Sequence, residues 1–189
     1  MEGAEDSEAA GVRDLRKRGL KKGDVVVGLT ASGTTPYVVG ALAQARKTGA
    51  FTIAVTVSPG SPVTKKARVV ICPETGPEVL AGSTRLKAGT AQKLVLNMLS
   101  TAAMVRLGHV YRNLMVNVHM SNAKLRRRGE RILEEVCHST PARARQLVRS
   151  SGGNLKVAIV MDRLGCHRRE AERILRIHKG HVNRALGEE

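Results

Sequence analysis

The chain has 189 residues, enough for one ordinary domain and a small appendage. Hydrophobic residues make up 42% of it but aromatic residues only 2%, so its core has to consist of Val, Leu, Ile, Met and Ala. Three cysteines, Cys72, Cys137 and Cys166, favour a reducing compartment over a disulfide framework. The acidic N-terminus is unlike a signal peptide, and the apolar run 94–105 is too short to span a bilayer. We therefore expect a cytoplasmic protein.

The formal net charge of +16 indicates anionic partners. Residues 1–122 and 123–189 each hold 16 basic and 8 acidic residues, although the second part is much shorter. Either nucleic acid or a phosphorylated metabolite would suit this charge. No aromatic-interleaved basic stripe is present, so we do not expect nucleic acid. Arg-rich, solvated helices are the commoner explanation for such an excess.

The first 18 residues are predicted to form a helix, because acidic residues open the segment and basic residues close it. Residues 24–38 follow with a Val-rich run that ends at Gly28, which is typical of a buried parallel strand. Ser32, Gly33, Thr34 and Thr35 then form a loop before a helix from Pro36 to about Lys47. Such a loop can cradle a phosphate, or its hydroxyls can simply cap the helix.

A second strand is predicted at 51–57, a short helical turn at 63–67 and a third strand at 68–72. The alternation of strands and helices indicates an α/β fold with a parallel sheet. Residues 73–90 form a polar connector, which is where function tends to lie. The helix expected at 88–107 is apolar nearly all round, so it should be buried against the sheet or in a subunit interface.

Residues 110–118 are expected to be extended, and the composition changes after Ser121. A basic helix at 122–136 should be followed by short helices at 141–150, 154–164 and 168–177, separated by glycines. We interpret these as a helical linker and a small three-helix module. Cys166 and nearby histidines do not have the spacing of a zinc site, so we expect no metal.

Four strings carry a resemblance to a known family: EGAED, GLTASGTTPYV, GPEVLAGSTRLKAGTAQKLVLNMLSTAAM and NLMVNV. They resemble the N-acetylmuramic acid 6-phosphate etherases, which have the sugar isomerase (SIS) fold and are related to the glucokinase regulatory protein. The resemblance implies a three-layer α/β/α SIS domain with a flavodoxin-like parallel sheet, incomplete at its N-terminus, over residues 1–122. It further implies a helical linker and a three-helix module similar to a ubiquitin-associated domain over residues 123–189.

The resemblance also implies a reaction: a carbon–oxygen lyase that cleaves the lactyl ether of N-acetylmuramic acid 6-phosphate to N-acetylglucosamine 6-phosphate and D-lactate in cell-wall sugar recycling. No metal, nucleotide or other cofactor is implied. The second glutamate of EGAED, implicated in acid–base catalysis, matches Glu5. The family's phosphate loop matches Ser32, Gly33, Thr34 and Thr35, and the later motif places further residues near the sugar: Glu78, Ser83, Thr84, Arg85 and Lys87.

The sequence departs from the family pattern in several places. No match is present for the upstream glycine-rich loop or for the motif that carries the other catalytic glutamate. Thr34 stands where Arg is usual, and Asn117 where Asp is usual. We therefore expect the C-terminal part of an etherase, as an expressed fragment, a split gene product or a truncated relative, and a homodimer packed through the apolar helix. Whether a companion chain supplies the other half stays open at this point. The alternative is a non-catalytic regulatory protein that binds a sugar phosphate.

Overall fold

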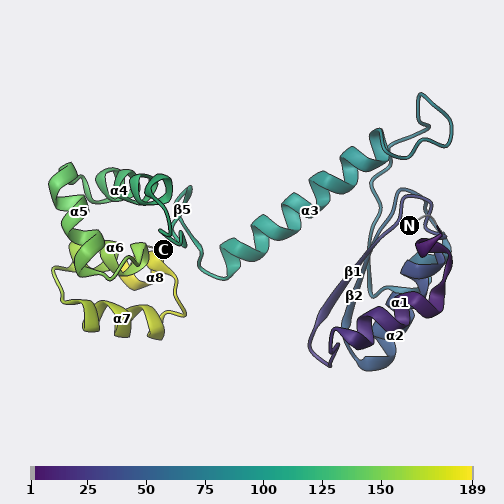
Figure 1. Cartoon of the computed structure of the whole chain (residues 1–189), viewed down its shortest axis with the longest axis horizontal. Helices are drawn as coiled ribbons and strands as arrows, with labels where there is room; N and C mark the ends of the chain where they lie inside the picture. Colours follow the sequence, from purple (N-terminus) through teal and green to yellow (C-terminus); the bar gives the residue numbers. More distant parts are fainter. Residues whose placement is uncertain (1–2, 189) are drawn as a thin grey trace. The chain divides into compact units, whose positions relative to one another are not determined.

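The computed structural model describes residues 3–188 and divides into two compact units. Their boundary lies between Met98 and Leu99, inside helix α3 (Lys87–Arg106). We call residues 3–98 the N-terminal unit and 99–188 the C-terminal unit (Figure 1). The domain boundary expected at residue 122 lies later in the chain than this division. In the described residues, no helix combines the length and the apolar character that crossing a bilayer requires.

The N-terminal unit is built on a three-stranded parallel sheet, which confirms the expected α/β class. Strands β1 (Val25–Leu29), β2 (Phe51–Val55) and β3 (Val69–Ile71) are adjacent in that order. Val25 pairs with Phe51 and Leu29 with Val55, so the two longer strands end together. A 3-10 turn, η2 (Pro62–Lys66), connects β2 to β3. The carboxyl ends of the strands therefore meet at one edge, where open α/β sheets hold ligands.

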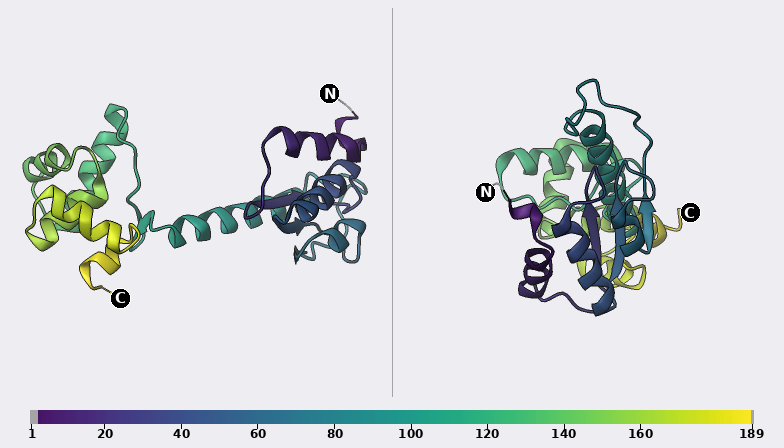
Figure 2. Two further views of the ribbon diagram at one scale, coloured as in Figure 1. Left: turned by 90° about the horizontal axis from the view of Figure 1, so that it is seen from below. Right: turned by 90° about the vertical axis from the view of Figure 1, so that its right-hand side faces the viewer.

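Two helices, α1 (Glu8–Lys17) and α2 (Pro36–Thr48), pack closely against each other in this unit (Figures 1 and 2). Glycines make the close approach possible. A Cβ on Gly11 would collide with the Tyr37 carbonyl oxygen, and one on Gly40 would lie 2.5 Å from the Glu8 carbonyl oxygen. The α2 helix also covers the sheet through the buried side chains of Val39 and Leu42, which cluster with residues of β2 and η2.

The start of the chain differs from the single helix expected over residues 1–18. Met1 and Glu2 lie outside the described residues, and Glu5 belongs to a separate 3-10 turn, η1 (Ala4–Asp6). Ser7 has extended backbone, and its hydroxyl accepts a hydrogen bond from the Ala10 N–H, so it caps α1. The expected role of Glu5 in the dipole of one continuous helix is therefore wrong, because the helix begins after it.

Helix α3 occupies almost the range expected for it. Most of its side chains are not buried against the sheet, although such burial was one of the two alternatives for this helix. Only Ala88 and Val95 are buried along its length in the described chain. Most of its large apolar side chains are exposed: Leu94, Leu96, Met98, Met104 and Val105. The other alternative, burial in a subunit interface, stays a prediction.

The C-terminal unit begins with an antiparallel hairpin of β4 (Val110–Tyr111) and β5 (Leu114–Met115). Five helices follow, and the first four lie within a residue of the expected ranges: α4 (Ala123–Cys137), α5 (Pro141–Ser150), α6 (Leu155–Leu164), α7 (Arg168–Ile177) and α8 (Val182–Leu186). Asn122, Thr140 and Asn154 cap three of them by accepting hydrogen bonds from first-turn N–H groups. Helix α8, of five residues, was not among the predicted elements.

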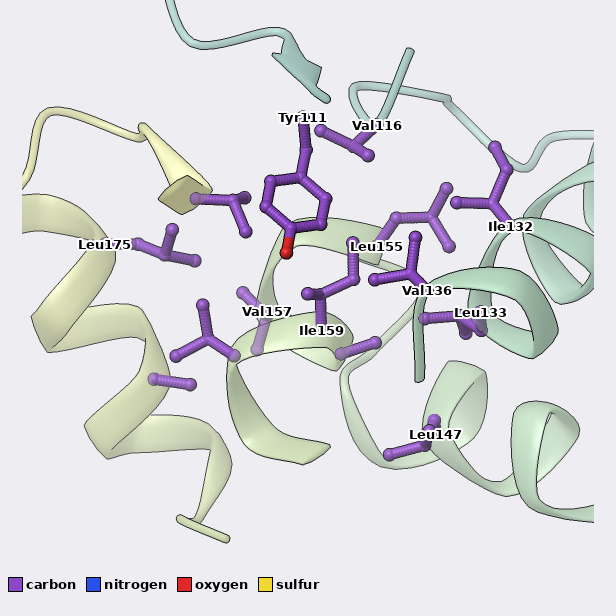
Figure 3. Close-up of a cluster of buried hydrophobic side chains, with 14 of the residues drawn as sticks. Tyr111, Val116, Ile132, Leu133, Val136, Leu147, Leu155, Val157, Ile159 and Leu175 are labelled. Carbon is purple, nitrogen blue, oxygen red and sulfur yellow. The ribbon is translucent and has the colours of Figure 1, made fainter. Parts of the chain in front are cut away.

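The core of the C-terminal unit includes α4, which was expected to be only a linker. Ile132, Leu133 and Val136 of α4 are buried with side chains of α5, α6 and α7 (Figure 3). Tyr111 of the hairpin is 1% exposed and joins the same core. The linker interpretation is therefore wrong, because the apolar face of α4 needs the other helices to cover it. A resemblance to a ubiquitin-associated domain stays a prediction.

Candidate functional site

A cavity of about 770 Å³ lies at the carboxyl end of β1, within the N-terminal unit. It is formed by η1, the loop from β1 to α2, the first turn of α2, the end of the polar connector and the first turns of α3. Its polar side chains are six hydroxyls, two carboxylates, a guanidinium and an amide: Glu5, Asp6, Thr30, Ser32, Thr34, Thr35, Tyr37, Thr84, Arg85 and Gln92. The structure thus brings together segments that are more than 80 residues apart in sequence.

The loop after β1 is organised by bonds among its own hydroxyl groups. The Thr30 and Thr35 hydroxyl oxygens lie 2.8 Å apart, and those of Ser32 and Thr34 lie 2.9 Å apart. The Gly33 N–H donates to the Thr30 hydroxyl oxygen at 3.1 Å. A hydroxyl can donate and accept at once, so this network can redirect its protons toward an anion without moving its oxygens.

Gly33 makes the loop geometry possible. Its φ is +71°, and a Cβ at this position would collide with the Ser61 side chain of the neighbouring loop. Its carbonyl oxygen accepts a hydrogen bond of 3.0 Å from the Val63 N–H, which ties the loop to η2. A residue other than glycine would therefore meet both unfavourable backbone geometry and a steric clash. The site residue Gly33 is predicted to act through the loop shape.

The hydroxyls do not act as a simple helix cap, which was the alternative to a phosphate cradle. Thr35 is the N-cap residue of α2, yet its side chain makes no capping hydrogen bond. It bonds to Thr30 instead. Pro36 occupies the first turn of α2, where its missing N–H costs nothing. The positive end of the α2 dipole therefore faces the same loop as the hydroxyls, an arrangement that favours an anion.

Glu5 lines this cavity together with the loop. Its segment is held in place by the α1–α2 contact and by a hydrogen bond of 3.1 Å from the Tyr37 hydroxyl to Asp14 of α1. That bond, more than burial, raises the pKa of Tyr37, so the phenol remains a donor to Asp14. The Glu5 carboxylate is exposed to solvent, which leaves it open to a ligand.

The connector residues divide into two groups. Thr84 and Arg85 line the cavity, whereas Glu78, Ser83 and Lys87 are not part of its lining. The Glu78 carboxylate accepts hydrogen bonds from the Ala88 N–H at 2.9 Å and the Lys87 N–H at 3.0 Å. These two bonds, the first more strongly, lower the pKa of Glu78. In this structure Glu78 caps α3, and contact of these three residues with a sugar stays a prediction.

Four polar residues of the lining were not predicted as site residues: Asp6, Thr30, Tyr37 and Gln92. Thr30 directly follows β1, and its place at the strand end was the available signal. Tyr37 lies in the first turn of α2, and Gln92 lies one turn after Gly89 on α3, a spacing that places both on one face. The Gln92 Nε2 atom is buried without a hydrogen-bond partner.

The described residues contain no group of three or more His, Cys, Asp or Glu side chains arranged to hold a metal ion. The groups that the cavity presents are hydroxyls, carboxylates and the Arg85 guanidinium. A guanidinium and hydroxyls bind phosphate, and a carboxylate can accept or donate a proton. The cavity is therefore suited to acid–base chemistry on a phosphorylated ligand.

Comparison with known proteins gives three findings. The sequence model of the SIS domain matches residues 5–102. Two proteins named N-acetylmuramic acid 6-phosphate etherase, from Yersinia pestis (strain Pestoides F) and Yersinia pseudotuberculosis serotype O:3 (strain YPIII), are each 50% identical over 186 residues. These alignments cover 98% of this chain, and the chain spans 63% of each relative's length.

A crystal structure from Bacillus subtilis, provisionally described as a phosphosugar isomerase, is also similar. It shares 25% sequence identity, and the match covers 75% of this chain and 38% of the other. The TM-score is 0.35.

Proposed function

Because the chain belongs to the SIS domain family, we propose that it holds a phosphorylated amino sugar beside the loop Ser32–Thr35. We propose further that it is part of an N-acetylmuramic acid 6-phosphate etherase. The observation that carries this proposal is that Glu5 lines the same cavity as the loop Ser32–Thr35, which we call the hydroxyl loop. The 50% identity to proteins of that name over nearly the whole chain supports the choice of substrate.

The phosphate is proposed to bind at the hydroxyl loop and the start of α2. Ser32, Thr34 and Thr35 would donate hydroxyl hydrogen bonds to its oxygens, with the helix dipole adding to the attraction. Thr84 and Arg85 would contact the sugar from the connector. Ser83, Glu78 and Lys87 remain proposed sugar neighbours that would have to turn toward the ligand.

The proposed reaction is an elimination followed by hydration. A base removes the proton at C2 of the open-chain sugar, the bond from C3 to the ether oxygen breaks, and an acid protonates the departing D-lactate oxygen. Addition of water across the double bond then gives N-acetylglucosamine 6-phosphate. We assign Glu5 to one of these two proton transfers. The second group is proposed to come from outside these 189 residues, on the same polypeptide or on a companion chain.

The exposed apolar residues of α3 support a proposed homodimer. Leu94, Leu96 and Met98 of the N-terminal unit are between 40% and 62% exposed. Leu94 and Met98 are four residues apart and share one face of the helix, and large exposed side chains side by side in this way are unusual on a surface that faces only water. A second copy packed on this helix would cover these side chains. Separately, we propose that the protein acts in the cytoplasm. Sedimentation of a well-folded monomer at micromolar concentration would contradict the dimer.

The function is tested by measuring D-lactate released from N-acetylmuramic acid 6-phosphate. The 189-residue chain alone should release little, and a companion polypeptide carrying the second carboxylate should restore release. Glu5→Gln should then lower the rate by about 10²–10⁴-fold, since it removes one acid–base group but keeps the side-chain shape. Glu8→Gln, on the first turn of α1, is the matched control and should change the rate little.

A second candidate function is non-catalytic sensing of a sugar phosphate. The hydroxyl loop is organised by its own hydrogen bonds, and holding a phosphate there needs no acid–base group, which favours this candidate. The same assay distinguishes the two. Tight binding of N-acetylglucosamine 6-phosphate with no lactate release under any of these conditions would favour the sensor. Turnover that survives Glu5→Gln would instead contradict the assignment of Glu5.

A further inference from the structure

A second cavity is lined only by residues of the C-terminal unit. Its volume is about 730 Å³, within the range of small-ligand sites. Its walls come from the end of α3, the β4–β5 hairpin, the turn between α7 and α8, and α8 itself. The charged and titratable side chains of this lining are mostly basic: Arg106, Arg112, Lys179, His181, Arg184 and Glu188.

The charge of Glu188 is already balanced by contacts within the protein. Its carboxylate accepts a hydrogen bond of 2.6 Å from the Tyr111 hydroxyl and one of 2.8 Å from the Arg163 guanidinium. Arg112 lies 3.7 Å from the same carboxylate. The lining holds four Arg and Lys side chains against this single carboxylate, which Arg163 from outside the lining also neutralises, so the cavity has a positive character that favours an anion.

Tyr111 lines the cavity and is anchored in the protein interior. Its ring is buried in the core of the C-terminal unit (Figure 3). Burial, and secondarily the bond to Glu188, raises the pKa of Tyr111, so its hydroxyl remains a donor. The Arg112 guanidinium lies over the ring, 5.2 Å from its centre. This stacking holds the Arg112 side chain at the cavity wall before any ligand arrives.

Two of the basic residues occupy backbone positions that favour glycine. Arg112 has a φ of +54° in the hairpin turn, and Lys179 has a φ of +52° in the turn after α7. Among the described residues, His138 is the other non-glycine residue with positive φ. Left-handed geometry is strained for side chains such as Arg and Lys, and such strain clusters at functional sites. Both residues line this cavity.

We propose that this cavity is a binding site for a small polyanion that carries phosphate groups, held mainly by Arg112 and Lys179. The site is separate from the proposed sugar-phosphate cavity and does not depend on that function. A guanidinium presents paired N–H groups that match phosphate oxygens, and an ammonium adds a point charge. A bounded cavity, in contrast to a long basic stripe, fits a small ligand better than a nucleic-acid backbone.

The test is a titration of the full chain with pyrophosphate, followed by the amide resonances of Tyr111 and Arg184. These signals report this cavity alone, so pyrophosphate bound at Ser32–Thr35 does not disturb the readout. We expect saturable shifts in the wild-type chain. Arg112→Gly and Lys179→Gly should each weaken binding about tenfold or more, because each removes a charge-assisted contact.

The glycine variants also separate binding from folding. Glycine relieves the positive φ at residues 112 and 179, so the melting temperature of each variant should stay the same or rise. His138→Gly is the matched control: its φ is +49°, its side chain is exposed and it is not part of the cavity lining. In this variant the strain of the positive φ should be relieved in the same way, so its melting temperature should stay the same or rise. It should bind pyrophosphate like the wild type.

Three results would overturn the site. They are an absence of saturable shifts at Tyr111 and Arg184, unchanged affinity in both glycine variants at the cavity, and equal weakening in the His138→Gly control. Displacement of pyrophosphate by a short DNA duplex at lower concentration would show a nucleic-acid surface and would also contradict the small-ligand site. Failure of lactate release has no bearing on these outcomes.

Discussion

The two units differ in how much of their apolar surface they bury within themselves. In the C-terminal unit one cluster joins buried side chains of the hairpin and of all five helices. The N-terminal unit has a smaller cluster of Val39, Leu42, Ala54 and Val63, and its strand residues Val69 and Val70 are about 40% exposed. Yet the smaller core supports the hydroxyl loop and Glu5. The proposed catalytic cavity thus lies in the unit that leaves more of its apolar surface exposed. The helical unit buries most of its apolar side chains within itself.

Given this difference between the two units, we expect the largest loss of stability from a core substitution in the C-terminal unit. Leu133 is 0% exposed in α4, and Leu133→Ala should lower the free energy of unfolding of residues 99–188 by about 2–5 kcal/mol. Denaturation followed by amide hydrogen exchange would measure this change. The exchange rates of β1 and β2 should stay the same if the two units are independent.

Leu164→Ala, at a side chain that is 45% exposed, is the control and should change stability by about 0.5 kcal/mol or less. Equal loss of protection in both units after Leu133→Ala would show that they unfold together, and the contrast between them would then be wrong.

A smaller effect is expected where α1 packs on α2 in the N-terminal unit. Gly40→Ala places a methyl group 2.5 Å from the Glu8 carbonyl oxygen, so the helices must separate, at a cost of about 1–3 kcal/mol. Since α1 follows directly after η1, this change should also weaken sugar-phosphate binding near Glu5. Thermal unfolding and a binding titration measure the two effects.

The control for the unfolding measurement is Gly89→Ala in α3, where the nearest atom to a new Cβ is 3.4 Å away; Gly89 lines the cavity, so this variant is compared for stability alone. Alanine is the better helix former, so this variant should gain up to about 1 kcal/mol. If Gly40→Ala were equally stabilising, the close helix contact would not be what positions Glu5.

The smallest effect concerns Glu78, which joins the connector to α3. Its folded pKa is lowered, so the stability contributed by this cap is present above the ordinary carboxyl pKa and is lost as pH falls through the lowered value. The amide resonances of Lys87 and Ala88 should titrate below the usual glutamate range. Glu78→Gln should abolish that titration. A midpoint in the ordinary range would show that the carboxylate does not hold these amides in solution.

The sequence predicted the elements that rest on local signals. The Val-rich strands, Pro36 at the start of α2 and the starts of α4 and α6 to within one residue were all readable without a structure, because turn and helix-start residues act within a few positions. The break at Ser7 was missed because acidic residues on both sides resemble one helix start. The role of α4 was missed because an amphipathic pattern does not say which partner covers it.

The candidate site was predictable only where local signals in the sequence point to it. The loop residues Ser32–Thr35 follow a strand directly, and Glu5 was found only through the family resemblance. Gln92 and Tyr37 could not be assigned, because their place in the cavity depends on how α3 and α2 meet the loop. Glu78 shows the converse: it belongs to the matching motif, yet backbone N–H groups of α3 engage its carboxylate in this structure.

The most direct measurement for the central proposal is a titration of the chain with N-acetylglucosamine 6-phosphate and, separately, with N-acetylglucosamine. The amide resonances of Ser32, Gly33, Thr34 and Thr35 are followed in both. We expect saturable shifts with the phosphorylated sugar and much weaker ones without the phosphate, since each charged hydrogen bond contributes about 1.5–3 kcal/mol. Equal affinity for the two sugars, or shifts that avoid this loop, would contradict this proposal.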